Sequence, residues 1–241
     1  MQNHHQWCII TEKNNSSYLN IKTMNVIIEL IEIIITAAMP LAVYLFLRKR
    51  TGAALKPFLT GFFTYMVVSW IRALFRLLLQ SGGVGYIAAN AALSGVLEEV
   101  GRYVAMMYVM HEYDKWHDAI AYGAGHGGAE LILGNLPVMV DSFLKGLHAG
   151  EVETEGLFSM IAFAECVFIH IVFSVLVMAA VHYKESKKYL YIAIVVHFLS
   201  DLVCGLLMQL DALLSLFASL CITALLYEYA RRTVKALDND G

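Results

Sequence analysis

The chain has 241 residues, of which 59% are hydrophobic and only 15% are charged, and its mean hydropathy is +0.63. Soluble domains usually carry about a quarter charged residues, so this composition excludes an ordinary soluble domain. Long apolar runs separated by short charged clusters instead predict an all-α polytopic membrane protein, a helical bundle in contact with the lipid bilayer. No nucleic-acid partner is expected.

The N-terminal residues differ in character from the rest of the chain. Residues 1–23 are polar and lack the charged start and apolar core of a signal peptide. We expect this tail to be disordered and residues 24–241 to form a single transmembrane domain. Met24 directly precedes the first apolar run, so Met1 and Met24 both stay open as the start.

Seven apolar segments have the length of about 17–25 residues that a helix needs to cross a bilayer. They are Val26–Leu47, Phe58–Leu79, Tyr86–Met110, Ala119–Val140, Leu157–Val181, Tyr189–Met208 and Leu213–Tyr229. The last two are joined by the short turn 209–212, which predicts a helical hairpin. The connection after the fourth segment is expected to be a long loop with the acidic residues Asp141, Glu151, Glu153 and Glu155.

Lysine and arginine are distributed unequally between the two sides of this arrangement. Eleven of the 17 basic residues follow the odd-numbered segments: Arg48, Lys49, Arg50, Lys56, Lys115, Lys184, Lys187, Lys188, Arg231, Arg232 and Lys235. Basic residues accumulate on the cytoplasmic side of membrane proteins. We therefore expect an outside N-terminus and a cytoplasmic C-terminus, in a bacterial plasma membrane.

Three charged residues lie within the third apolar segment: Glu98, Glu99 and Arg102. Ionised side chains cost several kcal/mol in hydrocarbon unless they meet partners, metal or water. Arg102 is four residues from Glu98 and three from Glu99, so it can lie beside either carboxylate on the helix. These three charged residues therefore predict polar or ionisable partner residues on other helices.

Three other segments offer such groups, namely His126 with Glu130, His170, and His197 with Asp201. At 1.5 Å per residue, Glu99 and the three histidines come to about 10–17 Å from the cytoplasmic boundary. A histidine and a carboxylate four residues apart can supply two metal ligands, or the carboxylate can orient the imidazole. The pattern predicts a polar, metal-binding centre inside the membrane.

Each of these signals also has an ordinary structural explanation. A membrane histidine can bond a neighbouring carbonyl, a His–Asp pair can satisfy itself, and the glycines around His126 can form a packing face. Pairing and snorkelling account for the remaining charged residues of the first two segments, which are Glu29, Glu32, Arg72 and Arg76. Glu165 has no assigned role. The four cysteines, three of which lie in apolar runs, are interpreted as small buried apolar residues rather than as disulfides or metal ligands.

The ordered set of motifs resembles the YhfC family, within the wider clan of CAAX-protease and bacteriocin-processing (CPBP) intramembrane metalloproteases, with PrsW-type proteases as relatives. The motifs are Glu98-Glu99-x-x-Arg102, Gly125-His126-Gly127-Gly128-x-Glu130, His170 and His197-x-x-x-Asp201. The two residues between Glu99 and Arg102 are closer to the pattern of the PrsW group, whereas the commoner CPBP pattern has three. The resemblance covers most of the chain from Met24 onward.

The resemblance implies metal-assisted or glutamate-assisted hydrolysis of a peptide bond. His126 and His197 would bind Zn²⁺, with Asp201 or Glu130 as an oxygen ligand and His170 as an alternative third ligand. Glu98 or Glu99 would act as the general base, and Arg102 would orient these carboxylates. The expected substrate is a membrane-embedded or lipidated peptide.

Two other classes of function stay open at this point. A proton- or cation-coupled transporter also places ionisable residues inside the membrane. A catalytically inactive membrane scaffold would retain the same residues for stability. The sequence specifies neither the substrate nor the oligomeric state.

Overall fold

The computed structural model describes the backbone of residues 2–79, 82–149, 156–182 and 187–239. Side chains are described for the same residues except 2–22, 157 and 237–239. The described residues form helices and no strand, which confirms the all-α prediction for them. The α-helices are α1 (Gln2–Thr51), α2 (Leu55–Arg76), α3 (Gly83–Val104), α4 (Trp116–Glu130), α5 (Leu136–Ala149), α6 (Gly156–His182), α7 (Lys188–Met208) and α8 (Ala212–Asn239). Two single π-helical turns, η1 (Ala105–Val109) and η2 (Leu131–Asn135), extend α3 and link α4 to α5.

Five helical segments are long and apolar enough to cross a membrane. They are Thr23–Thr51, Leu55–Arg76, Phe158–His182, Lys188–Met208 and Ala212–Ala236. These correspond to the first, second, fifth, sixth and seventh predicted segments. The third and fourth predicted segments do not meet the same test, because α3 contains three charged residues and α4 is only 15 residues long.

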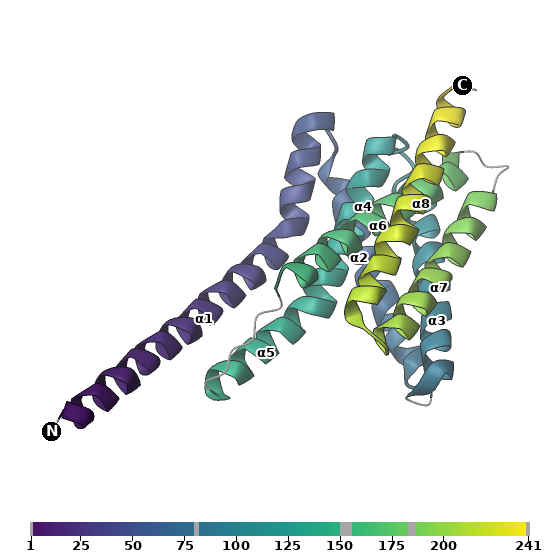
Figure 1. The fold of residues 1–241 in the computed structure, drawn as a ribbon. Coiled ribbons are helices and arrows are strands. Elements are labelled where there is room, and N and C mark those ends of the chain that lie inside the picture. Colours follow the sequence, from purple (N-terminus) through teal and green to yellow (C-terminus); the bar gives the residue numbers. More distant parts are fainter. Residues whose placement is uncertain (1, 80–81, 150–155, 183–186, 240–241) are drawn as a thin grey trace.

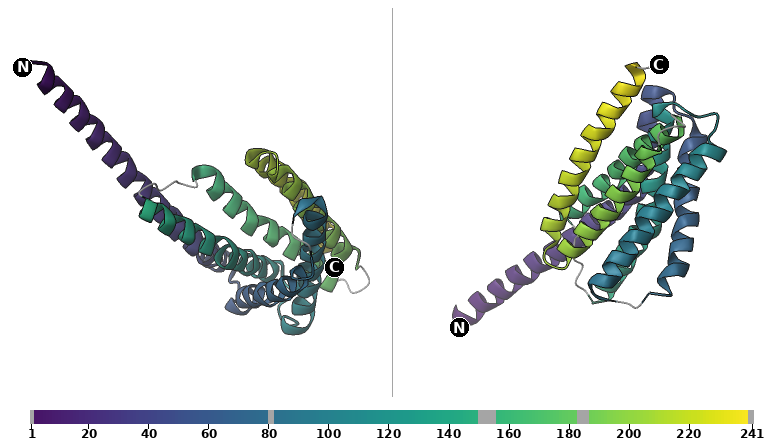
Figure 2. Two further views of the ribbon diagram at one scale, coloured as in Figure 1. Left: turned by 90° about the horizontal axis from the view of Figure 1, so that it is seen from below. Right: turned by 90° about the vertical axis from the view of Figure 1, so that its right-hand side faces the viewer.

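Helices α4 and α6 form the centre of the bundle. Helix α4 packs against α1, α2 and α6, and nearly all of its residues from Asp118 to Ala129 are buried. Helix α7 lies between α3 and α8, and α6 contacts both α7 and α8 (Figure 2). The α1–α2 connection and the end of α8 lie at the top of the bundle in Figure 1, and the α7–α8 turn lies at the opposite end.

Glycines allow α4 to approach three neighbours at once. A Cβ atom at Gly125 would lie 1.9 Å from the backbone oxygen of Phe58 in α2, and one at Gly123 would lie 2.4 Å from a backbone atom of α6. A Cβ at Gly128 would meet Pro40 of α1 at 2.3 Å. The glycine run that surrounds His126 is therefore a packing surface for backbones, and it carries the histidine into the centre of the bundle.

Several sequence-based expectations need correction or stay open. Residues 136–149 form helix α5, which runs beside α1, so the loop predicted after Val140 is helical at least as far as Ala149. Residues 150–155, with Glu151, Glu153 and Glu155, lie outside the described residues. Helix α1 begins at Gln2, but the side chains of residues 2–22 are not described, so the disorder expected for the tail stays a prediction. Cys221 is exposed, unlike the buried residue that its apolar context suggested.

The glycine contacts predict a sharp positional effect on stability. Gly125→Ala inserts a methyl group against the α2 backbone, so we expect it to destabilise the fold by about 1–3 kcal/mol or more. Gly134→Ala is the matched control, because no atom lies within 4 Å of the position of its Cβ. Thermal unfolding in detergent, followed by tryptophan fluorescence, measures both variants. Equal melting temperatures for the two would contradict this packing role.

Candidate active site

Both oxygens of Glu98 have polar partners, and the partners differ between the two. Its Oε1 accepts hydrogen bonds from Arg72 at 2.6 Å and from the Ser94 hydroxyl at 3.0 Å. Its Oε2 accepts a hydrogen bond from Nε2 of His126 at 3.2 Å and lies 4.0 Å from Nε2 of His197. The side chain is buried, so Arg72 and Ser94 fix one oxygen while the other faces two imidazoles.

Glu99 has a different environment although it is the adjacent residue. Arg102 Nη1 donates to both of its oxygens, at 2.9 and 2.8 Å, and all three groups of the Glu99–Arg102–His197 cluster are buried. Nδ1 of His197 donates to Oε1 of Glu99 at 2.7 Å. Nε2 of His197 then faces the Ser94 hydroxyl at 3.5 Å and Oε2 of Glu98 at 4.0 Å. A carboxylate on the other ring nitrogen is the arrangement that commonly orients metal-binding histidines.

His170 is held in the opposite tautomer. Arg102 Nη2 lies 3.0 Å from Nδ1 of His170, and because a guanidinium can only donate, Nδ1 must accept. Nε2 of His170 then carries the proton and donates to Oε2 of Glu130 at 2.6 Å. In this hydrogen-bond arrangement His170 connects Arg102 to Glu130 and offers no free lone pair.

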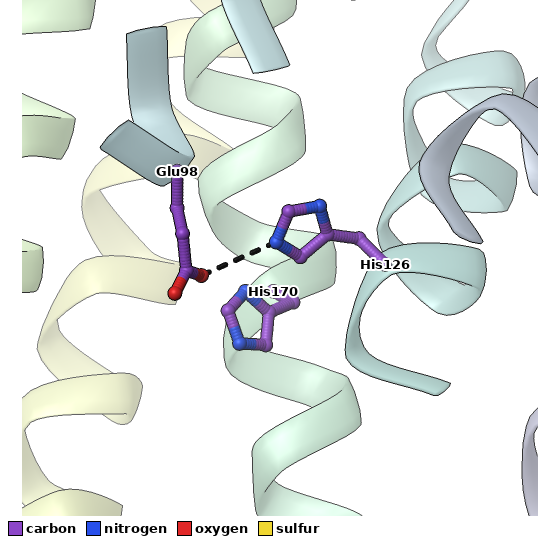
Figure 3. Close-up of side chains that lie close together, drawn as sticks. All are labelled: Glu98, His126 and His170. Atoms are coloured by element: carbon purple, nitrogen blue, oxygen red, sulfur yellow. Dashed lines mark hydrogen bonds and ion pairs between the residues drawn. The ribbon is translucent and has the colours of Figure 1, made fainter. Parts of the chain in front are cut away.

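The four helices that were expected to meet do converge on this centre. Glu98, His126 and His170 present ligand atoms within 4.8 Å of one another, and all three side chains are buried (Figure 3). The rings of His170 and His197 are 5.7 Å apart between centroids. Asp201 Oδ2 lies 3.8 Å from Nε2 of His197, on the same helix. The structure therefore brings together every residue in the sequence-predicted set, while their individual roles stay predictions.

The donor set fits a divalent metal in chemistry and in charge. Imidazole nitrogens with carboxylate oxygens are the ligands that Zn²⁺ takes in catalytic sites. The centre combines four acidic side chains (Glu98, Glu99, Glu130 and Asp201) with two arginines, Arg72 and Arg102. A divalent cation would offset the formal excess of negative charge in this buried place.

Three contacts correct or extend the sequence analysis. Arg72 was interpreted as a structural charge accounted for by pairing and snorkelling, and the structure shows that its partner is Glu98 of α3, 26 residues later in the chain. An arginine in an apolar segment indicates that a polar partner exists, but it does not identify that partner. Ser94 was not singled out, although it lies four residues before Glu98 and so on the same helix face. Phe173 also supports the site, since its ring stacks on His197 at 4.8 Å.

A polar cavity of about 270 Å³ adjoins this centre. Arg72, Ser94, Glu130, His197 and Asp201 line it from the site side. The polar groups of the centre therefore have space for several water molecules next to them, since a single water needs only about 10–15 Å³ of such volume.

Apolar helices around a buried cluster of histidines, carboxylates and arginines define a class of integral membrane protein with a metal-type centre in its core. The sequence model of the YhfC intramembrane metalloprotease family matches residues 35–164, more than half of the chain. The chain belongs to this family, and a metalloprotease family implies a metal. The match includes Glu98, Glu99, Arg102, His126 and Glu130, whereas His170, His197 and Asp201 lie beyond it.

A curated relative is consistent with this assignment. The "Uncharacterized membrane protein YhfC" of Bacillus subtilis (strain 168) is 30% identical over 113 residues. That match covers 39% of this chain and 41% of the relative, so less than half of the relative's length is compared.

The positions of the three histidines predict different effects on metal binding. We expect His126→Ala and His197→Ala to lower the bound metal by at least about tenfold, because each removes an imidazole whose Nε2 faces Oε2 of Glu98. His170→Gln is expected to retain metal near the level of the unchanged protein, because both ring nitrogens of His170 are already hydrogen-bonded, one to Arg102 and one to Glu130. Elemental analysis of the purified proteins after size exclusion measures this. Loss of metal in His170→Gln from a folded protein would place His170 among the ligands instead.

Proposed function

We propose that this protein is an intramembrane metalloprotease that hydrolyses a peptide bond of a membrane-embedded or lipidated substrate. The observation that carries the proposal is Oε2 of Glu98, which faces Nε2 of both His126 and His197 in a buried polar centre. A carboxylate that can accept a proton, two imidazoles and a neighbouring cavity with room for water are the features that metal-assisted peptide hydrolysis uses. The family description supports the reaction class.

His126, His197 and Asp201 are the residues that would hold the metal, which we propose to be Zn²⁺. His126 comes from α4, His197 and Asp201 come from α7, and Glu98 of α3 lies near both histidines. When bound, such a metal supplies Lewis-acid polarisation of a carbonyl oxygen and of water. Both imidazoles are buried, and His197 also lines the polar cavity beside the centre.

Glu98 and Glu99 divide the remaining work in this proposal. Glu98 takes the proton of the attacking water on Oε2, while Arg72 and Ser94 hold Oε1 in place. Glu99 is fully engaged by Arg102 and His197, so it acts as a positioning residue. His170 links Arg102 to Glu130, because it accepts a hydrogen bond from Arg102 and donates one to Glu130, which lines the cavity.

The proposal includes seven membrane spans in a single domain. To the five apolar helices it adds α3, and α4 continued through η2 into α5, because α4 alone has only 15 residues. Helices α3 and α4 pack among the others in the bundle and carry the residues of the centre, Glu98, Glu99, Arg102, His126 and Glu130. The proposed orientation has the N-terminus outside and the C-terminus in the cytoplasm of a bacterial cell, on the basis of the basic residues.

The orientation predicts the side from which exposed positions can be labelled. In chains without native cysteines, Asp211→Cys in the α7–α8 turn should react with an impermeant reagent added outside intact cells. Arg50→Cys near the end of α1 should react only after the membrane is opened. Both residues are exposed, so access depends on sidedness alone. The reverse labelling pattern would overturn the proposed orientation.

The division of work predicts unequal effects of two isosteric substitutions. Glu98→Gln should lower turnover by about 10²–10⁴-fold, the usual contribution of a general base. Glu99→Gln should lower it less and should mainly weaken metal binding, by about 10–100-fold, because it loosens His197. The assay is cleavage of fluorescent transmembrane model peptides in proteoliposomes, with metal content measured on the same preparations.

The outcome also separates the rival functions. A larger loss in Glu99→Gln than in Glu98→Gln, at equal metal content, would contradict the assigned roles. Ion flux in the same proteoliposomes, abolished by Glu98→Gln, would favour a transporter. A metal-free protein that cleaves no peptide would favour the scaffold.

A further inference from the structure

Glu165 is an acidic residue in an apolar helix that neither the sequence motifs nor the proposed mechanism uses. It lies on α6, half-buried among apolar segments, and accepts a hydrogen bond from the Thr223 hydroxyl of α8. A carboxylate among apolar helices needs further polar neighbours or water. The cavities next to Glu165 have room for such water.

Two cavities meet at Glu165. The first is the cavity beside the candidate active site, which extends from Arg72 and His197 to Glu165, Cys204 and Ser219. The second also has a volume of about 270 Å³ and lies between the start of α6, the end of α7 and the start of α8. Glu165, Cys204 and Ser219 line both cavities, so the two are neighbours that share one wall.

The second cavity leads to one end of the bundle. Its far wall is formed by Phe158 at the start of α6 and by Met208 and Ala212, which flank the α7–α8 turn. This turn lies at the end of the bundle opposite the α1–α2 connection (Figure 1). The two cavities together therefore reach from the buried histidines towards the end that carries the turn.

Side chains that can bind water lie along this path, although the outer cavity also has apolar walls, such as Phe158, Met208 and Leu213. Ser200 lines the inner cavity, Ser215 lines the outer cavity, and Ser219 lines both together with Glu165. By contrast, a cavity between α2 and α3 is lined mainly by side chains such as Phe63, Val67 and Ile71, and it would take up hydrocarbon. Water prefers a cavity in which it finds several polar partners.

We infer that the cleft between α6, α7 and α8 is the water conduit of the buried centre, entered from the end of the α7–α8 turn, with Glu165, Cys204 and Ser219 at its narrow point. The conduit deepens the proposed function and rests on it for its purpose, since hydrolysis consumes water. Its path rests only on the cavities and their lining.

Two native cysteines allow the path to be probed directly. Cys204 lies at the shared wall and Cys166 lies in the inner cavity. Chains that retain only one of them, with Cys8 and Cys221 replaced by Ser, are reconstituted in vesicles and treated from each side with a small cationic, membrane-impermeant methanethiosulfonate. Asp211→Cys identifies the side that bears the turn, whatever the orientation proves to be.

We expect both cysteines to react from the side that labels Asp211→Cys, with Cys204 faster than Cys166. Ser219→Trp, which fills the narrow point, should slow labelling of Cys166 at least tenfold and leave Asp211→Cys unchanged. Leu220→Trp is the matched control, because Leu220 is exposed on the outer surface of the same helix. Ser219→Leu serves as a smaller substitution if the tryptophan disrupts folding.

Three results would overturn the conduit: no reaction at Cys166 where Asp211→Cys reacts, reaction from the opposite side, or unchanged labelling of Cys166 in both Ser219 variants. None of these measurements uses proteolysis. The same rates are expected in the Glu98→Gln chain, so failure of the conduit and failure of the proposed function can be told apart.

Discussion

The ion pair between Arg102 and Glu99 is the constraint on which the rest of the centre depends. Both groups are buried, and breaking such a pair by removing one partner usually costs about 3–5 kcal/mol, because it leaves an uncompensated charge. The pair also has directional consequences. Arg102 donates to His170 and Glu99 accepts from His197, so one ion pair sets the tautomers of two histidines on two other helices.

Positioning these groups requires unusually close contacts between helices. His126 reaches Glu98 because α4 lies deep in the bundle, and α4 can lie there because glycines replace side chains at its contacts with α1, α2 and α6. Small residues are the general means by which membrane helices approach one another. The short helix α4 thus carries both the glycine packing surface and His126 of the candidate site.

The distribution of polarity is inverted relative to a soluble protein. Large apolar side chains such as Trp70, Leu74 and Leu225 are exposed on the outside, where lipid covers them. Charged and hydroxyl-bearing side chains gather inside, at the centre and around Glu165 and Ser219. This arrangement separates the buried polar groups from the hydrocarbon that surrounds the bundle.

The sequence by itself determined the helical class, the positions of most apolar helices and the set of residues at the centre. These follow from local properties: the length of apolar runs, and the cost of placing Glu98, Glu99 and Arg102 within one of them. Only the tertiary structure decided how the two glutamates differ, because adjacent residues on a helix point about 100° apart and meet different partners. It likewise assigned Arg72 to Glu98 and made residues 136–149 helical, since both depend on contacts between helices distant in the chain. A spacing pattern records which side chains share a face of one helix, but the choice of partner across the bundle is made by packing.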